Sequence, residues 1–213
     1  RIRSRGLGDV YKRQVYKQEE VTNHDLASFV DILQKKVGEG SNWIHYGLTS
    51  SDIVDSANSL LILQSIEIAQ ELILDLLKEL KLKAKENKDT KIIGRTHGVY
   101  AEETFLGNIF GNWYLEIKRS LDRLERAKVS IAYGKLSGPV GNHTVVTEEM
   151  EKITLEKLGL KPEIFASQIV SRDRYAEVFT SLSILASTYE RISTNLRSYQ
   201  RSEISEMYEP FKD

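Results

Sequence analysis

Three long stretches of the chain repeat apolar residues at intervals of three and four, the spacing that puts side chains on one face of an α-helix. The clearest stretch runs from 171 to 206, with apolar or aromatic residues at positions 175, 178, 182, 185, 189, 192, 196 and 199. The chain has only three prolines, at positions 139, 162 and 210, so no proline breaks this stretch. We predict one long helix here, packed as in a bundle or coiled coil.

Two further long helices are expected at about 51–86 and 102–132. The first follows Thr49-Ser50-Ser51-Asp52, which has the hydroxyl and the carboxylate three residues later that form a capping box. The predicted apolar stripes are Ile53, Ala57, Leu60, Leu61, Ile68, Leu72, Leu76 and Leu80 in the first helix, and Phe105, Ile109, Trp113, Ile117, Leu121 and Leu124 in the second.

Shorter helices and one loop complete the predicted fold. Thr22 should cap a helix that starts near Asp25, and Thr147 should open another that Gly159 and Pro162 end. The segment KLSGPVG, 135–141, is expected to form a short loop or hairpin. The predicted class is all-α, with three helices each about 45 Å long. Helices of that length need equally long neighbours, so we expect an oligomeric bundle.

Both ends of the sequence look truncated. Residues 1–14, RIRSRGLGDVYKRQ, begin without methionine, are basic and have no clear period. We interpret them as a non-native or linker-derived segment, without the apolar region of a signal peptide.

Composition excludes several classes of function. Lys plus Arg number 30 and Asp plus Glu 31, so no basic excess favours a nucleic-acid partner. The chain has no apolar run of about 18 residues, so no membrane span is predicted. The chain has no cysteine, so it has neither disulfides nor a thiolate nucleophile, which fits a cytoplasmic location.

The candidate chemistry lies near the starts of the predicted helices. Three of the four histidines, His24, His45 and His97, precede or begin a helical pattern. A helix start offers free N–H groups that can hold a carboxylate or phosphate, and a nearby imidazole can move a proton near neutral pH. No two histidines stand four apart, and no HExxH or phosphate-binding glycine loop is present, so zinc and nucleotide-hydrolysis chemistry lose support.

The same candidate residues also have simpler, purely structural interpretations. Thr49, Ser50 and Asp52 could serve only as a helix cap. His97 could be a loop histidine bonded to local backbone. His143 lies in a polar stretch, and we expect it to be solvated.

Five motifs taken together are more specific than any one of them. In order, they are NHD (23–25), HYGLTSSDIVDSA (45–57), GRTHGVYAEET (94–104), KLSGPVGN (135–142) and SQIVSRDRYAE (167–177). This series resembles the adenylosuccinate lyase family of the fumarase/aspartase superfamily over essentially all of 15–213. The resemblance implies that 15–50 is a remnant of an N-terminal domain and that 51–213 is part of a central helical bundle.

The resemblance also implies an activity. Members of the family cleave adenylosuccinate to AMP and fumarate, and the succinylated aminoimidazole carboxamide ribotide to the carboxamide ribotide and fumarate, by β-elimination of a C–N bond and without a metal or cofactor. By motif, His97 would be the general acid, and Thr49 and Ser50 would bind the succinyl carboxylate. The remaining implied residues are Asn23, His24, Asp25 and Gln168 as substrate contacts, and His45, Thr96 and Asp52 in support.

The family implies further expectations about assembly. Its members are homotetramers that build each site from three subunits, and a serine beyond residue 213 would act as the general base, so this fragment alone should be inactive. Tyr100 and Glu103 stand where the family commonly has histidine and proline. The alternatives are another lyase of the superfamily, acting on argininosuccinate or a carboxymuconate, and a non-catalytic helical bundle.

Overall fold

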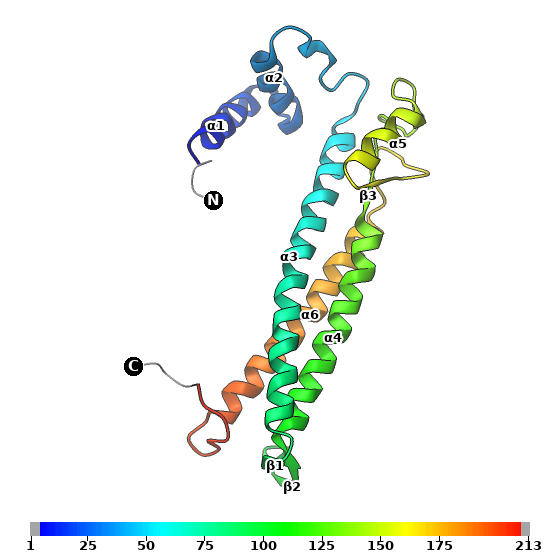
Figure 1. The fold of residues 1–213 in the computed structure, drawn as a ribbon. Helices are drawn as coiled ribbons and strands as arrows, with labels where there is room; N and C mark the ends of the chain where they lie inside the picture. Colours follow the sequence, from blue (N-terminus) through cyan, green and yellow to red (C-terminus); the bar gives the residue numbers. More distant parts are fainter. Residues whose placement is uncertain (1–4, 210–213) are drawn as a thin grey trace. The chain divides into compact units, whose positions relative to one another are not determined.

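The computed structural model describes residues 5–209, with side chains from residue 10 onward, and is predominantly helical (Figure 1). The helices are α1 (Arg5–Thr22), α2 (Asp25–Val37), α3 (Ser50–Glu86), α4 (Leu106–Ile131), α5 (Glu148–Lys157) and α6 (Asp173–Tyr199), with one 3-10 turn, η1 (Ser41–Trp43). Strands β1 (Lys91–Thr96) and β2 (Val99–Phe105) form an antiparallel hairpin, and β3 (Tyr133–Gly134) pairs in parallel with β4 (Lys161–Pro162). The predicted all-α class is confirmed.

The chain divides into two compact units. Unit 1 comprises Arg1–Leu61 and Ala132–Ser171, and unit 2 comprises Ile62–Ile131 and Arg172–Asp213. None of the helices within residues 5–209 is long and apolar enough to cross a membrane.

Unit 2 is built around the packed faces of α3, α4 and α6, which lie side by side in Figure 1. Its buried core is formed by Ile66, Ile73, Leu77, Leu80, Trp113, Ile117, Leu124, Ala127, Ile131, Val178, Leu185 and Ile192. Each large side chain that is fully buried here contributes roughly 1.5–3 kcal/mol to folding. The predicted seam of α6 is confirmed at seven of its eight positions, which are buried or packed on this core, whereas Tyr189 is exposed.

The stripe predicted for α3 is wrong at several positions. Leu61, Ile68 and Leu72 are exposed, and the core instead contains Ile66, Ile73 and Leu77, which the stripe did not include. The predicted Leu80 is buried in the core, and the predicted Leu76 packs against it. The reason is that α3 carries apolar residues on more than one face, so periodicity alone cannot show which face meets α4 and α6.

The start of the third long helix was also predicted wrongly. Residues 91–105 form the β1–β2 hairpin, and α4 begins only at Leu106. Gly107 then allows the end of α3 and the start of α4 to meet, because a Cβ there would lie 2.6 Å from the Ala84 carbonyl oxygen. The apolar positions of α4 from Ile109 to Leu124 are buried or packed on the core as predicted.

The first two helices of unit 1 are joined by two residues, Asn23 and His24. Asn23 has a φ of 52° and donates its N–H to the Glu19 carbonyl at 2.8 Å, which ends α1 in the left-handed conformation that asparagine tolerates. The N-cap of α2 is His24, so the prediction of Thr22 as the cap is wrong. The hydroxyl of Thr22 instead donates to the His24 carbonyl at 3.1 Å.

The remainder of unit 1 follows the predictions more closely. Thr147 caps α5 by accepting the Met150 N–H, as expected. Residues 135–141 form a loop, and the hairpin alternative is wrong because the adjoining strand β3 pairs in parallel with β4. Of the segment 1–14, residues 1–4 lie outside the described residues and 5–14 belong to α1. The origin of that segment and the division at residue 50 stay predictions.

Candidate functional site

The start of α3 is held by a reciprocal pair of hydrogen bonds. Thr49 donates its backbone N–H to Asp52 Oδ2 at 2.8 Å, and the Asp52 N–H donates to the Thr49 carbonyl at 3.0 Å. The carboxylate half of the predicted capping box is therefore present. Ser50 is the first residue of this helix, where N–H groups have no partner within the helix.

Asp52 is also the centre of a buried polar cluster. Its side chain is completely buried, and Oδ1 accepts a hydrogen bond from the ammonium group of Lys135, which is equally buried. Lys135 Nζ also donates to the Gly138 carbonyl at 2.9 Å, and the Gly138 N–H donates to Asp52 Oδ2 at 3.2 Å. The cluster ties the 135–141 loop to the turn that carries Thr49 and Ser50.

The backbone of Lys135 is fixed as well. Its N–H donates to Ser56 Oγ at 3.1 Å, and the Ser56 hydroxyl donates to the Lys135 carbonyl at 3.2 Å. The loop is thus bound to the first two turns of α3 through both its backbone and its charge. A buried charge pair with this many partners is costly to break from one side only.

His24 and Ser50 are brought together in unit 1 although 26 residues separate them. His24 Nδ1 accepts the Ala27 N–H at 3.3 Å, and Nε2 lies 3.3 Å from Ser50 Oγ. An Nδ1 that accepts a hydrogen bond carries no proton, so in this arrangement the neutral ring donates from Nε2 to Ser50. Asp25 Oδ1 also lies 3.3 Å from Nδ1.

The other predicted substrate contacts of unit 1 are more exposed. Asn23 and Asp25 flank His24 on the surface, and Asp25 Oδ1 accepts the Leu26 N–H at 2.6 Å. Gln168 is exposed in the segment between β4 and α6. His45 has a φ of 66°, and its Nε2 is one of five buried side-chain polar atoms without a hydrogen-bond partner among the described residues.

Thr96 and His97 belong to unit 2 and lie at the tip of the β1–β2 hairpin, not at a helix start as the sequence suggested. Thr96 pairs with Val99, so His97 and Gly98 form a two-residue turn, with φ values of 55° and 78°. Positive φ at both positions is the signature of a type I′ turn. The turn exposes the imidazole of His97 to solvent.

Gly94 and Gly98, which flank the Arg-Thr-His segment, have different structural roles. Gly98 supplies the left-handed conformation, and a Cβ there would meet nothing within 4 Å. Gly94 lies at an irregularity in the strand pairing, where a Cβ would approach the Glu102 carbonyl oxygen to 2.9 Å. The two glycines therefore shape the segment around His97 for different physical reasons, one conformational and one steric.

Arg95 connects the hairpin to the segment that follows α6. One of its terminal nitrogens donates to Glu206 Oε2 at 2.9 Å and to the Ile93 carbonyl at 3.2 Å. The hydrogen bond to Glu206 raises the pKa of Arg95, against the smaller opposing effect of burial. An open hollow of about 760 Å³ lies beside this contact, lined by 95 and 98–100 of the hairpin and by Arg201, Glu203 and Ile204.

Sequence reasoning missed the structural importance of Lys135 and Arg95. Nothing in a single sequence shows that a lysine will be fully buried or that Arg95 will meet a carboxylate 111 residues away. The hairpin did leave a signal: β-branched and aromatic residues flank a His-Gly pair, and histidine is among the residues that adopt positive φ more readily.

The prediction that His143 is solvated is wrong. Its side chain is 20% exposed, its Nδ1 donates to the Val146 carbonyl at 3.1 Å, and its Nε2 lies 3.6 Å from Glu151 Oε2. Glu151 is itself buried and accepts the Leu136 N–H at 2.6 Å. Among the residues that the structure describes, no three histidines or carboxylates are grouped to hold a metal ion.

Comparison with known proteins identifies relatives along the whole chain. The model of the family described as "Lyase" matches residues 9–212. The chain is 44% identical over 198 residues to an adenylosuccinate lyase of Aquifex aeolicus, covering 93% of this chain and 45% of the relative. It is 45% identical over 213 residues to the adenylosuccinate lyase of Thermotoga maritima, covering 100% and 49%. The chain therefore spans about half the length of these curated relatives.

Solved structures share the fold at lower sequence identity. A fumarate lyase from Mesorhizobium sp. BNC1 superposes with a TM-score of 0.85 at 21% identity, covering 91% of this chain and 46% of that one. A β-carboxy-cis,cis-muconate cycloisomerase from Acinetobacter calcoaceticus also gives 0.85, at 22% identity, covering 94% and 48%. At these identities the likeness establishes the fold alone.

Proposed function

On the premise that the chain belongs to the lyase family, whose model matches residues 9–212, we propose that the protein containing it is an adenylosuccinate lyase. It would cleave adenylosuccinate to AMP and fumarate, and the succinylated aminoimidazole carboxamide ribotide to the carboxamide ribotide and fumarate. The names of relatives at 44% and 45% identity favour this substrate class. The argininosuccinate and carboxymuconate alternatives have no comparable support.

The proposed reaction is a β-elimination. A base removes the proton next to a carboxylate, negative charge builds on that carboxylate, and the C–N bond breaks as the leaving nitrogen receives a proton. Thr49 and Ser50 would bind the carboxylate, because hydroxyls and free N–H groups at a helix start stabilise the developing charge. The proposed general base is a serine outside this chain.

The observation that carries the proposal is the 3.3 Å approach of His24 Nε2 to Ser50 Oγ. It joins two motifs that were each expected to bind substrate, and it orients the Ser50 hydroxyl at the first turn of α3. The buried His45 Nε2 without a partner among the described residues also favours a polar ligand nearby, because native proteins rarely leave such atoms unsatisfied.

His97 is proposed as the general acid. An imidazole side chain is chemically suited to donate a proton to the leaving nitrogen. Its exposed position in a turn leaves the ring accessible for that step. Thr96 would support the turn, since its pairing with Val99 closes the hairpin directly beside His97.

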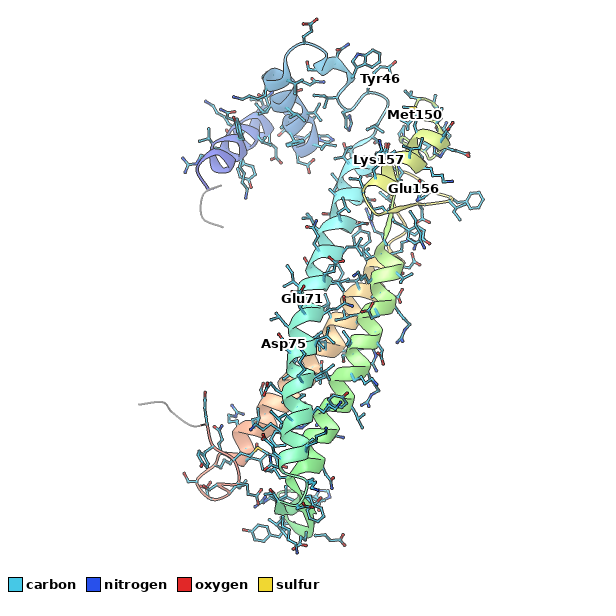
Figure 2. The ribbon with its side chains drawn as sticks, in the orientation of Figure 1. Tyr46, Glu71, Asp75, Met150, Glu156 and Lys157 are labelled. Atoms are coloured by element: carbon cyan, nitrogen blue, oxygen red, sulfur yellow. The ribbon has the colours of Figure 1, made fainter. Side chains whose placement is uncertain are left out.

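We also propose that the complete protein is a cytoplasmic homotetramer in which subunits share residues of each site. The exposed apolar positions Ile68 and Leu72 of α3 and Phe179 of α6 would suit a neighbouring subunit. Glu71 and Asp75 lie exposed on α3 as well (Figure 2), so such an interface would need to satisfy or avoid these carboxylates.

Fumarate release tests the proposed activity directly. The complete protein should release fumarate from adenylosuccinate but not from argininosuccinate, and it should not convert a carboxymuconate to its lactone, whereas the chain 1–213 alone should be inactive. Release from argininosuccinate instead would move the protein to the alternative lyase. A folded complete protein that processes none of these substrates would favour the non-catalytic bundle.

A further inference from the structure

We propose that Arg95 and Glu206 are positioning residues, whose ion pair holds the His97-Gly98 turn in place for proton transfer. This role rests on the general-acid function proposed for His97. The pair forms a clamp between the hairpin and the end of α6, and we refer to Arg95, Tyr100 and Glu206 together as the hairpin clamp.

The hairpin side of the clamp lies one residue pair from the turn. Arg95 is the register partner of Tyr100, and the next pair towards the tip, Thr96 with Val99, closes the turn. The Arg95 guanidinium lies over the Tyr100 ring, with 5.2 Å from its central carbon to the ring centre. It also donates to the Ile93 carbonyl at 3.2 Å, which spans the strand irregularity at Gly94. The guanidinium is thus attached to both strands of the hairpin.

The other side of the clamp is anchored to the helical core. After α6 the chain turns back, so that the Glu206 N–H donates to the carbonyl of Tyr199, the last residue of α6, at 3.1 Å. The next residue, Met207, packs against the buried core of unit 2. Glu206 therefore presents its carboxylate from a fixed backbone.

Partial burial makes this ion pair more specific than a surface pair. The side chains of Arg95 and Glu206 are 19% and 16% exposed, whereas the Lys91–Glu103 pair of the same hairpin is 65% and 58% exposed. A two-stranded hairpin is marginally stable by itself, so its tip needs an external contact to keep one position. Within the described residues, the hairpin clamp supplies such a contact next to His97.

Displacement of a catalytic group costs rate even when the group itself is unchanged. A shift of about 1 Å can lower a rate by roughly 10²-fold. Without Glu206, the hairpin should sample several positions and His97 should align with the leaving nitrogen less often. Substrate binding by Thr49 and Ser50 should not depend on this contact.

The test compares two glutamates that each pair with arginine in unit 2. In the complete protein, Glu206→Ala should lower kcat roughly tenfold to a hundredfold, with little change in KM. Glu206→Gln keeps an oxygen acceptor for Arg95 and should recover part of that loss. Glu116→Ala, which removes the Arg191 pair between α4 and α6, should lower thermal stability and leave kcat unchanged.

Hydrogen–deuterium exchange provides a readout that does not require activity. In Glu206→Ala, peptides covering residues 91–105 should exchange roughly five- to tenfold faster, while those of α4 and α6 should not change. Unchanged exchange in the hairpin would show that the clamp does not exist, and a wild-type kcat in Glu206→Ala would overturn its positioning role. If the wild-type protein releases no fumarate, the proposed function fails, and exchange alone still decides whether the clamp exists.

Discussion

Thr49 and Ser50 stand at a helix start tied down by a fully buried ion pair, whereas His97 stands exposed at the tip of a two-stranded hairpin. In unit 1, the Asp52 carboxylate accepts hydrogen bonds from the Lys135 ammonium group and from the N–H groups of Thr49 and Gly138. In unit 2, the turn around His97 depends on backbone conformation and on the pair between Arg95 and Glu206.

This difference matches the two kinds of work proposed for these residues. Stabilising charge on a carboxylate requires donors that do not reorganise during the reaction, and a buried polar cluster holds them rigidly. A proton donor must instead meet the leaving group, so an exposed group with a defined position is suited to the task. Four substitutions test this comparison.

Replacing the imidazole should have the largest effect. We choose His97→Asn because Asn-Gly is a favoured type I′ pair and should keep the turn intact. In the complete protein, kcat for fumarate release should fall by roughly 10²- to 10⁴-fold, the usual contribution of a general acid.

The matched control is His143→Asn, which changes another histidine of positive φ, here 53°. It should fold and keep the wild-type kcat. Wild-type turnover in His97→Asn would exclude His97 as the general acid.

Breaking the buried pair should have the largest effect on stability. Lys135→Met leaves Asp52 as an uncompensated buried charge, and should lower the free energy of unfolding by roughly 3–5 kcal/mol in urea titrations. A pair at the surface serves as the comparison. Lys128→Met removes a 2.9 Å contact with Glu67 and should lower the free energy of unfolding by less than about 1 kcal/mol.

A Lys135→Met variant that does not fold can be tested through its partner. The double variant with Asp52→Asn removes both charges and should regain part of the lost stability. If Lys135→Met costs no more than Lys128→Met, the buried cluster does not fix the start of α3.

Adding a single methyl group to the His97-Gly98 turn should lower the free energy of unfolding. Gly98→Ala meets no steric obstacle but must hold a left-handed conformation, at a cost of roughly 1–2 kcal/mol. Gly111→Ala, in α4 and equally unobstructed, should instead stabilise the protein by roughly 0.5–1 kcal/mol. Equal effects of the two substitutions on the unfolding free energy would contradict the type I′ assignment.

The smallest effect concerns Glu116 and is sensitive to pH. Burial opposes its ionisation, but hydrogen bonds from Arg191 and Thr188 outweigh this and lower the pKa of Glu116 below its ordinary value of 4.5. A lowered folded-state pKa stabilises the fold above that ordinary value, and this contribution is lost as pH falls through the folded-state pKa.

Glu116→Gln should therefore lower the free energy of unfolding at pH 7 by about 1 kcal/mol or less. The deficit should shrink as the pH falls below 4.5, when the wild-type carboxylate takes up its proton. A deficit that persists unchanged in acid would show that the ion pair is not its cause.

Local patterns in the sequence were sufficient for the main helices. Apolar periodicity located α3, α4 and α6, because a helix that buries one face must repeat apolar residues at its own period. Capping chemistry located the starts of α3 and α5 because those hydrogen bonds join residues three apart. The same local logic marked Ser50, His24 and His97 as residues able to do chemistry, although it placed His97 at a helix start and the structure has it in a hairpin turn.

Only the tertiary structure decided which groups meet. It selected the Ile66–Leu80 face of α3 as core, because α3 is apolar on several faces and the choice depends on what α4 and α6 present. It buried Lys135 against Asp52, joined His24 to Ser50 and paired Arg95 with Glu206. These contacts span 83, 26 and 111 residues, distances at which no local periodicity or capping rule applies.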